Sequence, residues 1–261
     1  MLAVDLKLPL APTMRSRYLQ IARQLRQNQQ PGWFDALRRA STLSVGEGSE
    51  AYKEALLELG EYLLRDKHIP ENSKNVEEGV ALLSRAAELG NAPAINLLGQ
   101  HFFKRGQFAK AYEMLHDKDP QPMDLTSRGM LAWMCLSGVK EDMSKAKALL
   151  QSIDKAPASE LPAHSECRKN CRTLLDALRS DSNADALAAA AELLAAPRGS
   201  FLVPGVPLRN PSLAVIYLKC SVRERSQVGR QRMSRVLDAA SSADRKLADN
   251  PMVRLSLFTL Y

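Results

Sequence analysis

Residues 75–104 read NVEEGVALLSRAAELGNAPAINLLGQHFFK, a stretch that predicts two helices joined by a tight turn. Asn75 stands at an N-cap position, and Glu77 and Glu78 follow in the first turn, where a helix favours negative charge. Gly90 tolerates the left-handed conformation in which many helices end. Apolar residues recur at helical spacing in both segments: Val80, Leu82, Leu83, Ala86 and Ala87, then Ala94, Leu97, Leu98, Phe102 and Phe103. Each apolar stripe needs a neighbour to cover it, which predicts one unit of a larger helical array.

Two short patterns recur along the chain in constant order. The first places a helix former and a small residue three and four positions after a cap-like residue, and it starts at Asn75, Gln107, Asp142 and Asn210. These starts are 32, 35 and 68 residues apart, the last distance being two periods of 34. The second pattern, Ala-x-x-x-Leu-Gly, occupies residues 55–60 and 94–99, and its end returns as Leu131-Ala132. Periods of this size predict stacked helical pairs.

These patterns resemble the Sel-one-like repeat (SLR) family, a relative of the tetratricopeptide repeats. The best matches are RAAELG at 85–90 and GVKEDMSKA at 138–146, and the resemblance covers roughly residues 50 to 225. The chain departs from the family motif where Leu63 and Cys135 fill a tyrosine position and where Gly79 replaces alanine. The resemblance implies an all-α fold, a right-handed α-solenoid of antiparallel helix pairs with helical caps.

Four segments are expected from the positions of prolines, glycines and charged residues along the chain. They are a flexible N-terminal arm at 1–13, an N-terminal helical cap at 14–48, the repeat array at 49–223 and a basic C-terminal helical cap at 224–261. Inside the array, helices are predicted at about 164–179 and 183–194, and the pattern leaves open which is the insertion. The loop PRGSFLVPGVPLRNP at 197–211 excludes a helix, because it is rich in glycine and proline. It is expected to pack its own apolar residues on the array, with a partner-binding arm as the alternative.

Composition narrows the class of protein. The chain has 261 residues, of which 45% are hydrophobic and 25% charged, as in ordinary soluble domains. No apolar run is long enough to span a bilayer, and the first residues lack the pattern of a secretory signal. The four cysteines do not recur in regular pairs, which favours free thiols in a reducing compartment. A bacterial cytoplasmic location is therefore expected.

Patterns for catalysis and cofactor binding are missing from the sequence. GxxxxGK[ST], GxGxxG and HExxH do not occur, so no cofactor is expected. His164, Cys167 and Cys171 share one helix face at i, i+3 and i+7, which makes them the one candidate metal group. The two cysteines also continue an apolar stripe, so buried core thiols are the favoured interpretation. The sequence predicts a protein that is not an enzyme.

The repeat frame predicts which residues face a partner. Tetratricopeptide-like arrays line their concave surface with the first helix of each pair, and the position after the frame glycine points into that groove. The predicted partner-binding residues are Glu61, Arg65, Asn96, Gln100, Lys104 and Trp133. Trp133 stands out because exposed tryptophans are enriched in binding hot spots. The alternative is that Trp133 packs under a neighbouring helix.

A non-catalytic interaction scaffold is the expected function, with a peptide or a folded protein domain as partner. The alternative is a nucleic-acid-associated protein, since the net charge of +7 is concentrated at the two ends. Residues 1–40 hold 7 basic and 2 acidic side chains, and residues 219–261 hold 9 and 4.

Overall fold

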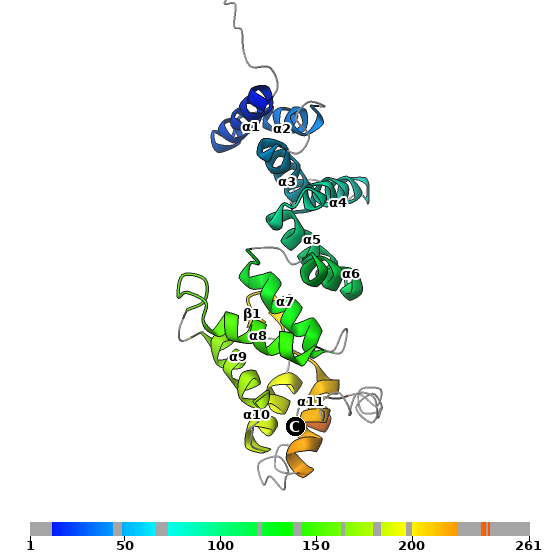
Figure 1. Ribbon diagram of the computed structural model, residues 1–261, viewed down its shortest axis with the longest axis vertical. Coiled ribbons are helices and arrows are strands. Elements are labelled where there is room, and N and C mark those ends of the chain that lie inside the picture. The colour runs from blue at the N-terminus through cyan, green and yellow to red at the C-terminus, as the bar shows by residue number, and fades with distance from the viewer. Residues whose placement is uncertain are drawn as a thin grey trace, which may run out of the picture. The chain divides into compact units, whose positions relative to one another are not determined.

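The computed structural model describes residues 12–43, 49–65, 73–118, 122–137, 142–162, 165–179, 184–196, 200–223, 236–238 and 240. Within these ranges the chain is helical apart from one short β-hairpin (Figure 1), and the predicted all-α fold of paired helices is confirmed. The first elements are α1 (Pro12–Gln27), α2 (Trp33–Thr42), α3 (Glu50–Arg65), α4 (Ser73–Glu88), α5 (Ala92–Lys104), α6 (Phe108–Tyr112) and the π-helix η1 (Glu113–Asp117). The others are α7 (Leu125–Leu136), α8 (Met143–Asp154), α9 (Glu166–Ala177), α10 (Ala184–Ala195), β1 (Phe201–Val203), β2 (Val206–Pro207) and α11 (Pro211–Arg223).

The chain forms two compact units. The first comprises residues 1–102 and 113–123, and the second comprises residues 103–112 and 124–261. Residues 1–11 of the expected arm at 1–13 lie outside the described residues, while residues 12 and 13 belong to α1. All of the expected C-terminal cap except 236–238 and 240 also lies outside them. The expected domain boundaries therefore stay predictions.

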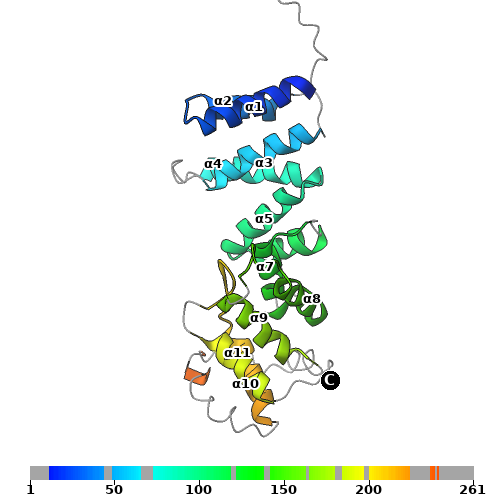
Figure 2. The ribbon, with the colours of Figure 1, turned by 90° about the vertical axis from the view of Figure 1, so that its left-hand side faces the viewer.

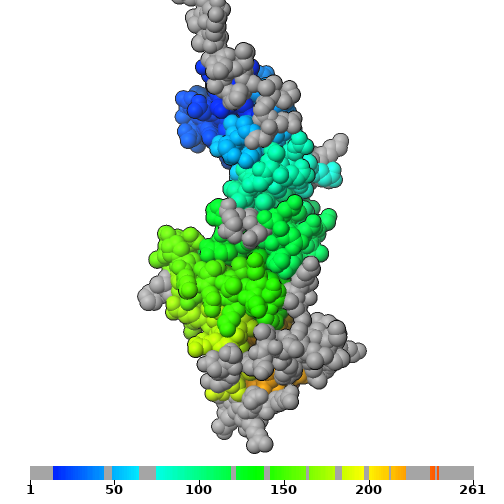
Figure 3. Space-filling model, viewed as in Figure 1, coloured from blue at the N-terminus to red at the C-terminus, as the bar shows by residue number. Residues whose placement is uncertain are grey.

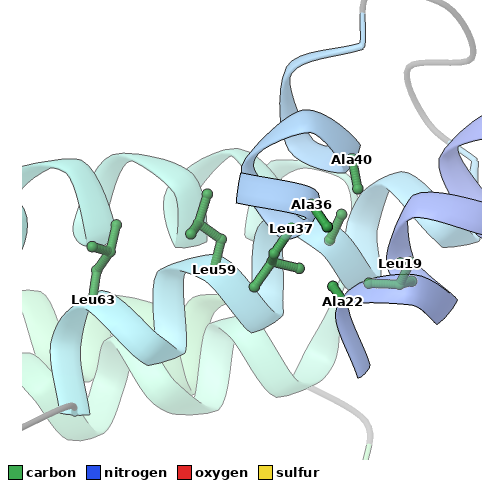
Figure 4. Packing of buried hydrophobic residues seen from close by; sticks show 8 residues of the cluster. Leu19, Ala22, Ala36, Leu37, Ala40, Leu59 and Leu63 are labelled. Carbon is green, nitrogen blue, oxygen red and sulfur yellow. The ribbon is translucent and has the colours of Figure 1, made fainter. Parts of the chain in front are cut away.

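In the first unit, α1 pairs with α2 and α3 pairs with α4 (Figure 2). The cap hairpin α1–α2 shares one hydrophobic core with α3 (Figure 4). The buried residues of this core are Leu19, Ala22, Ala36, Leu37, Ala40, Ala55, Leu59 and Leu63. Pro12 occupies the first turn of α1, where its missing N–H costs no helical hydrogen bond, so the helix starts two residues before the expected Met14.

Arg15 fixes the cap hairpin to the helix that follows. Its guanidinium is fully buried and donates to the carbonyl oxygens of Ala40, at 2.9 Å, and Leu43. It also lies 4.3 Å from the ring centroid of Tyr52 on α3. A buried charge needs such compensation, so this arginine orders the end of α2 rather than binding a partner.

Two glycines explain how closely α3 and α4 pack. A Cβ at Gly60 would lie 2.7 Å from Cγ of Leu83, and a Cβ at Gly79 would lie 3.2 Å from the carbonyl oxygen of Gly60. Gly79, where the repeat motif has alanine, thus allows the two backbones to approach each other.

The segment after Gln107 differs from the expected helix. A regular α-helix was expected to continue to about Asp117, but residues 113–117 form a π turn, with a hydrogen bond from the N–H of Lys118 to the carbonyl of Glu113. Leu115 is fully buried against Gly99, where a Cβ would lie 2.5 Å from its side chain.

In the second unit, α7 pairs with α8 and α10 pairs with α11, while α9 contacts both α8 and α10. Because α10 is the hairpin partner of α11, α10 takes the first-helix role of the last repeat and α9 is the additional helix. The sequence left this choice open.

The glycine- and proline-rich loop forms the antiparallel hairpin β1–β2, which was not predicted. Gly205 has φ of 82° after Pro204, the sequence signature of a type II turn. Four apolar side chains of the loop are buried: Leu202, Val203, Val206 and Leu208. The hairpin contacts α7 and α9, so the expectation that the loop packs its apolar residues on the array is confirmed for these four side chains. Phe201 remains 40% exposed.

Candidate partner-binding surface

On α5, three of the predicted site residues follow one another at intervals of four: Asn96, Gln100 and Lys104. This spacing places the three side chains in one row, here called the α5 row. Exposure increases along the row, from 4% for Asn96 and 8% for Gln100 to an exposed Lys104. The frame therefore predicted a common face, but only its last member is open to solvent.

Asn96 is buried because it binds backbone of its own unit. Its Nδ2 donates to the carbonyl oxygen of Pro122, 3.1 Å away, in the connection that precedes α7. Its Oδ1 is buried and has no hydrogen-bond partner among the described residues. The α5 row thus uses a side-chain amide to hold a non-helical backbone segment.

On α3, the structure describes the side chain of only one of the two predicted site residues. Glu61 is half-buried, and Arg65 ends the helix with a side chain outside the described set. Tyr62, between them, packs against Trp33 and Phe34 of α2. The groove register did not include this aromatic group.

Trp133 lies on α7 in the second unit and is half-buried. Its ring is 5.4 Å from the ring of Phe103, at 82°, and 5.3 Å from that of Phe108, at 43°. Its Nε1 is buried and has no acceptor in the part of the chain that the structure describes. This is the packed environment of the alternative interpretation, with part of the ring still accessible.

Gly129 lies three positions before the frame residue Ala132, as Asn96 lies three before Gly99, so the repeat register places it on the groove face of α7. The hairpin covers it. A Cβ at Gly129 would lie 2.3 Å from Cγ2 of Val203. Asn170 of α9 also donates from Nδ2 to the carbonyl oxygen of Phe201, at 3.1 Å. The chain's own hairpin therefore occupies the face of α7 that the register assigns to a partner.

The six predicted site residues do not form one described cluster. Glu61, Arg65, Asn96 and Gln100 belong to the first unit, whereas Lys104 and Trp133 belong to the second. By the four-residue spacing, the α5 row shares one face of α5, and Glu61 and Arg65 share one face of α3.

The aromatic group at α2 and α3 was missed by sequence reasoning. Trp33, Phe34 and Tyr62 form mutual ring contacts, and the guanidinium of Arg26 lies 5.3 Å from the ring centroid of Trp33. A useful signal was available in the adjacent pair Trp33-Phe34, which no helical stripe can bury on a single line.

The thiols are in core positions. Cys135 and Cys171 are fully buried, and burial raises the pKa of each from the ordinary 9.0 to about 12. The Sγ of Cys171 contacts the carbonyl oxygen of Leu150 at 3.1 Å. Burial also raises the pKa of the half-buried Cys167. Such groups are poor nucleophiles at neutral pH, because the thiolate is the reactive form.

Two further predictions from the sequence, the metal group and the basic C-terminal segment, involve residues outside the described ranges. His164 lies outside them, and within the described ranges no three His, Cys, Asp or Glu side chains are grouped for a metal. The basic segment 224–235 is likewise outside them. None of the helices described has both the length and the apolar character needed to cross a bilayer.

Comparison with known proteins returns a structural likeness alone. No protein-family model matches the chain, and no curated protein does. One similar solved structure is the crystal structure of c5321, a protective antigen present in uropathogenic Escherichia coli strains and displaying an SLR fold. Its sequence identity is 15% and the TM-score is 0.42, over 95% of this chain and 46% of that chain. This chain thus spans about half the length of that protein.

Proposed function

We propose that this chain is a non-catalytic adaptor that holds an extended protein segment along the α5 row. The observation that supports this is the bond from Asn96 Nδ2 to the Pro122 carbonyl. An amide that binds a main-chain carbonyl recognises backbone whatever the side chains of the bound segment are. Because Asn96 already binds the chain's own Pro122 carbonyl, an extended peptide would meet the row at its exposed end, Lys104.

The other members of the row add what a peptide site requires. Gln100 is almost fully buried, so a bound segment would reach the row at its open end. Lys104 is exposed and supplies a cation for a carboxylate. Because the row lies on a continuous helix, its side chains are positioned before binding, which lowers the entropic cost of association.

The test uses the tagged full-length chain to capture partners from its native cells, with and without nuclease. Lys104→Glu is the informative variant, and Arg105→Glu is the matched control, since Arg105 is an exposed cation on the adjacent turn. A stoichiometric protein that survives nuclease, falls about tenfold with Lys104→Glu and persists with Arg105→Glu is the expected result. Trp133→Phe, which keeps an aromatic ring but removes the indole N–H, measures the part played by Trp133.

The contrary result would be a set of proteins that disappears with nuclease and does not respond to Lys104→Glu. It would favour the alternative function, association with nucleic acid through the basic end segments.

A further inference from the structure

A second interaction surface, separate from the α5 row, lies where the cap hairpin meets α3 in the first unit. Its parts are Arg26 at the end of α1, Trp33 and Phe34 at the start of α2, and Tyr62 near the end of α3; we call it the Arg26 surface. The turn between α1 and α2 brings these residues together, because Gln29 and Gly32 both have left-handed backbone, with φ of 54° and 88°. Helices α1 and α2, which carry three of its four residues, are blue in Figure 3.

The three rings form one connected group. The centroids of Trp33 and Tyr62 are 4.4 Å apart with their planes at 87°, and those of Phe34 and Tyr62 are 5.5 Å apart. Trp33 and Phe34 lie against the core of the cap hairpin, yet all three rings remain only half-buried. Partly accessible tryptophan and tyrosine beside an arginine is the composition typical of interaction hot spots.

The charge on Arg26 is what distinguishes this surface from an ordinary core edge. Its exposed guanidinium lies 5.3 Å from the Trp33 centroid and 5.9 Å from that of Tyr62. Among the described residues, no carboxylate is within ion-pair distance of it.

Two other arginines of the cap hairpin do form ion pairs with carboxylates. Arg23 binds Glu54 and Glu58, at 2.8 and 2.5 Å, and Arg38 binds Glu78 at 2.7 Å. The protein thus neutralises two of these cations with its own acids, whereas Arg26 has only ring faces as described partners.

The position of the Arg26 guanidinium beside the rings suits it to bind a carboxylate from a partner. The group is exposed, and its N–H donors can bind a carboxylate in a two-point arrangement. The half-buried rims of Trp33 and Tyr62 would then contact an apolar side chain next to that carboxylate.

The surroundings favour an acidic partner. Residues 12–42 contain six arginines, of which Arg15 is buried and Arg23 and Arg38 bind glutamates. The other three, Arg17, Arg26 and Arg39, outnumber the one acidic residue of the segment, Asp35. Single-stranded nucleic acid is less well matched, because base stacking requires open ring faces. Here Trp33 and Tyr62 meet edge to face, and Arg26 occupies ring face as well.

We infer that the Arg26 surface binds an acidic protein segment in which Asp or Glu alternates with large apolar side chains. The site does not depend on the proposed α5 row. If the α5 row binds a partner, the Arg26 surface is a second contact of the same adaptor. If the row has no ligand, the Arg26 surface is its first contact.

The experiment titrates the full-length chain with a short fluorescent peptide in which Glu alternates with Leu and Phe, and with a control peptide that has Gln in place of Glu. Arg26→Gln is expected to weaken binding of the Glu peptide about tenfold. Arg17→Gln is the matched control, because Arg17 is exposed, lies on the same helix and, nine residues away, points to the opposite side. It is expected to change binding less than about twofold.

A second readout reports on the rings themselves. The chain has two tryptophans, so Trp133→Phe leaves Trp33 as the one indole fluorophore. Peptide binding is expected to change its emission, and circular dichroism confirms that each variant is folded.

Several outcomes would overturn the inference: equal binding of the Gln peptide, equal loss with Arg17→Gln, or an unchanged Trp33 emission. Tighter, Arg26-dependent binding of a single-stranded oligonucleotide would also overturn it, in favour of nucleic acid. Loss of the Glu peptide with Lys104→Glu, but not with Arg26→Gln, would assign the peptide to the α5 row; this inference would then fail while the proposed function stands.

Discussion

Contacts between single atoms decide which parts of the repeat pattern remain open to a partner. At Gly129 the absence of a side chain makes room for Val203, and at Asn96 an amide binds the carbonyl of Pro122. Both positions face the groove in the repeat register, yet both contact the chain's own non-helical segments. A register derived from helical periodicity identifies the face of a residue, but whether a distant loop covers that face depends on contacts that periodicity does not contain.

Gly129→Ala tests whether the hairpin is held by this close approach. A Cβ placed 2.3 Å from Cγ2 of Val203 must displace the hairpin or the helix, so we expect a loss of about 1–3 kcal/mol in the free energy of unfolding, measured by chemical denaturation. Val203→Ala removes the opposing methyl groups. The double variant is therefore expected to be more stable than the sum of the two single losses implies, by about 1 kcal/mol. Strictly additive losses would show that Val203 does not hold the hairpin at Gly129.

Single elements were predicted well where their pattern is local. The helix pairs follow from spacing, capping residues and turn glycines, and their bounds differ from expectation by only a few residues, as at Pro12. The π turn at 113–117 was missed, because its trigger is the contact between Leu115 and Gly99 rather than a local signal. The hairpin at 201–207 was recognised as non-helical, but its strands are too short for an alternating pattern to be visible.

The connection between α8 and α9 depends on one buried side chain, that of Arg168. Its guanidinium donates to the carbonyl oxygens of Asp154, Ala156 and Leu161, the last two at 2.8 and 2.5 Å. A single planar fork thereby satisfies carbonyls at the end of α8 and in the following turn. Lysine carries the same charge but cannot reproduce the geometry of the fork.

We therefore expect Arg168→Lys to lower the free energy of unfolding by about 2 kcal/mol and to speed amide hydrogen exchange in residues 155–162. Arg172→Lys is the matched control, since Arg172 is exposed and also binds Asp154, at 2.8 Å. Its expected cost is below about 0.5 kcal/mol. Similar exchange rates in both variants would mean that the connection is ordered without Arg168.

At the scale of the whole molecule, the site was harder to predict than the fold. Burying an apolar stripe is a requirement that every repeat shares, so the repeated pattern reveals it. A binding surface is specified by a few residues that appear once. Arg26, Trp33 and Tyr62 come from three helices and meet through a turn with left-handed backbone, and nothing repeats in that arrangement.

The buried thiols make the stability of the whole molecule depend on pH. Cys135 and Cys171 have folded-state pKa values of about 12, because burial disfavours the thiolate, whereas an ordinary cysteine thiol has a pKa of 9.0. Well below pH 9 both states hold the proton and the contribution is constant. Above it the unfolded state loses protons that the folded state keeps, so stability falls as pH rises toward 12.

The expected loss at pH 10 is up to about 2 kcal/mol for each of the two thiols, measured by urea unfolding between pH 7 and pH 10. Replacing Cys135 and Cys171 together by alanine should flatten this part of the pH dependence, even if the variant is less stable at pH 7. Cys167→Ala, at a half-buried position, should leave most of it in place. If the double variant keeps the full slope, the two thiols are accessible enough to ionise in the folded protein, and core positions for them are ruled out.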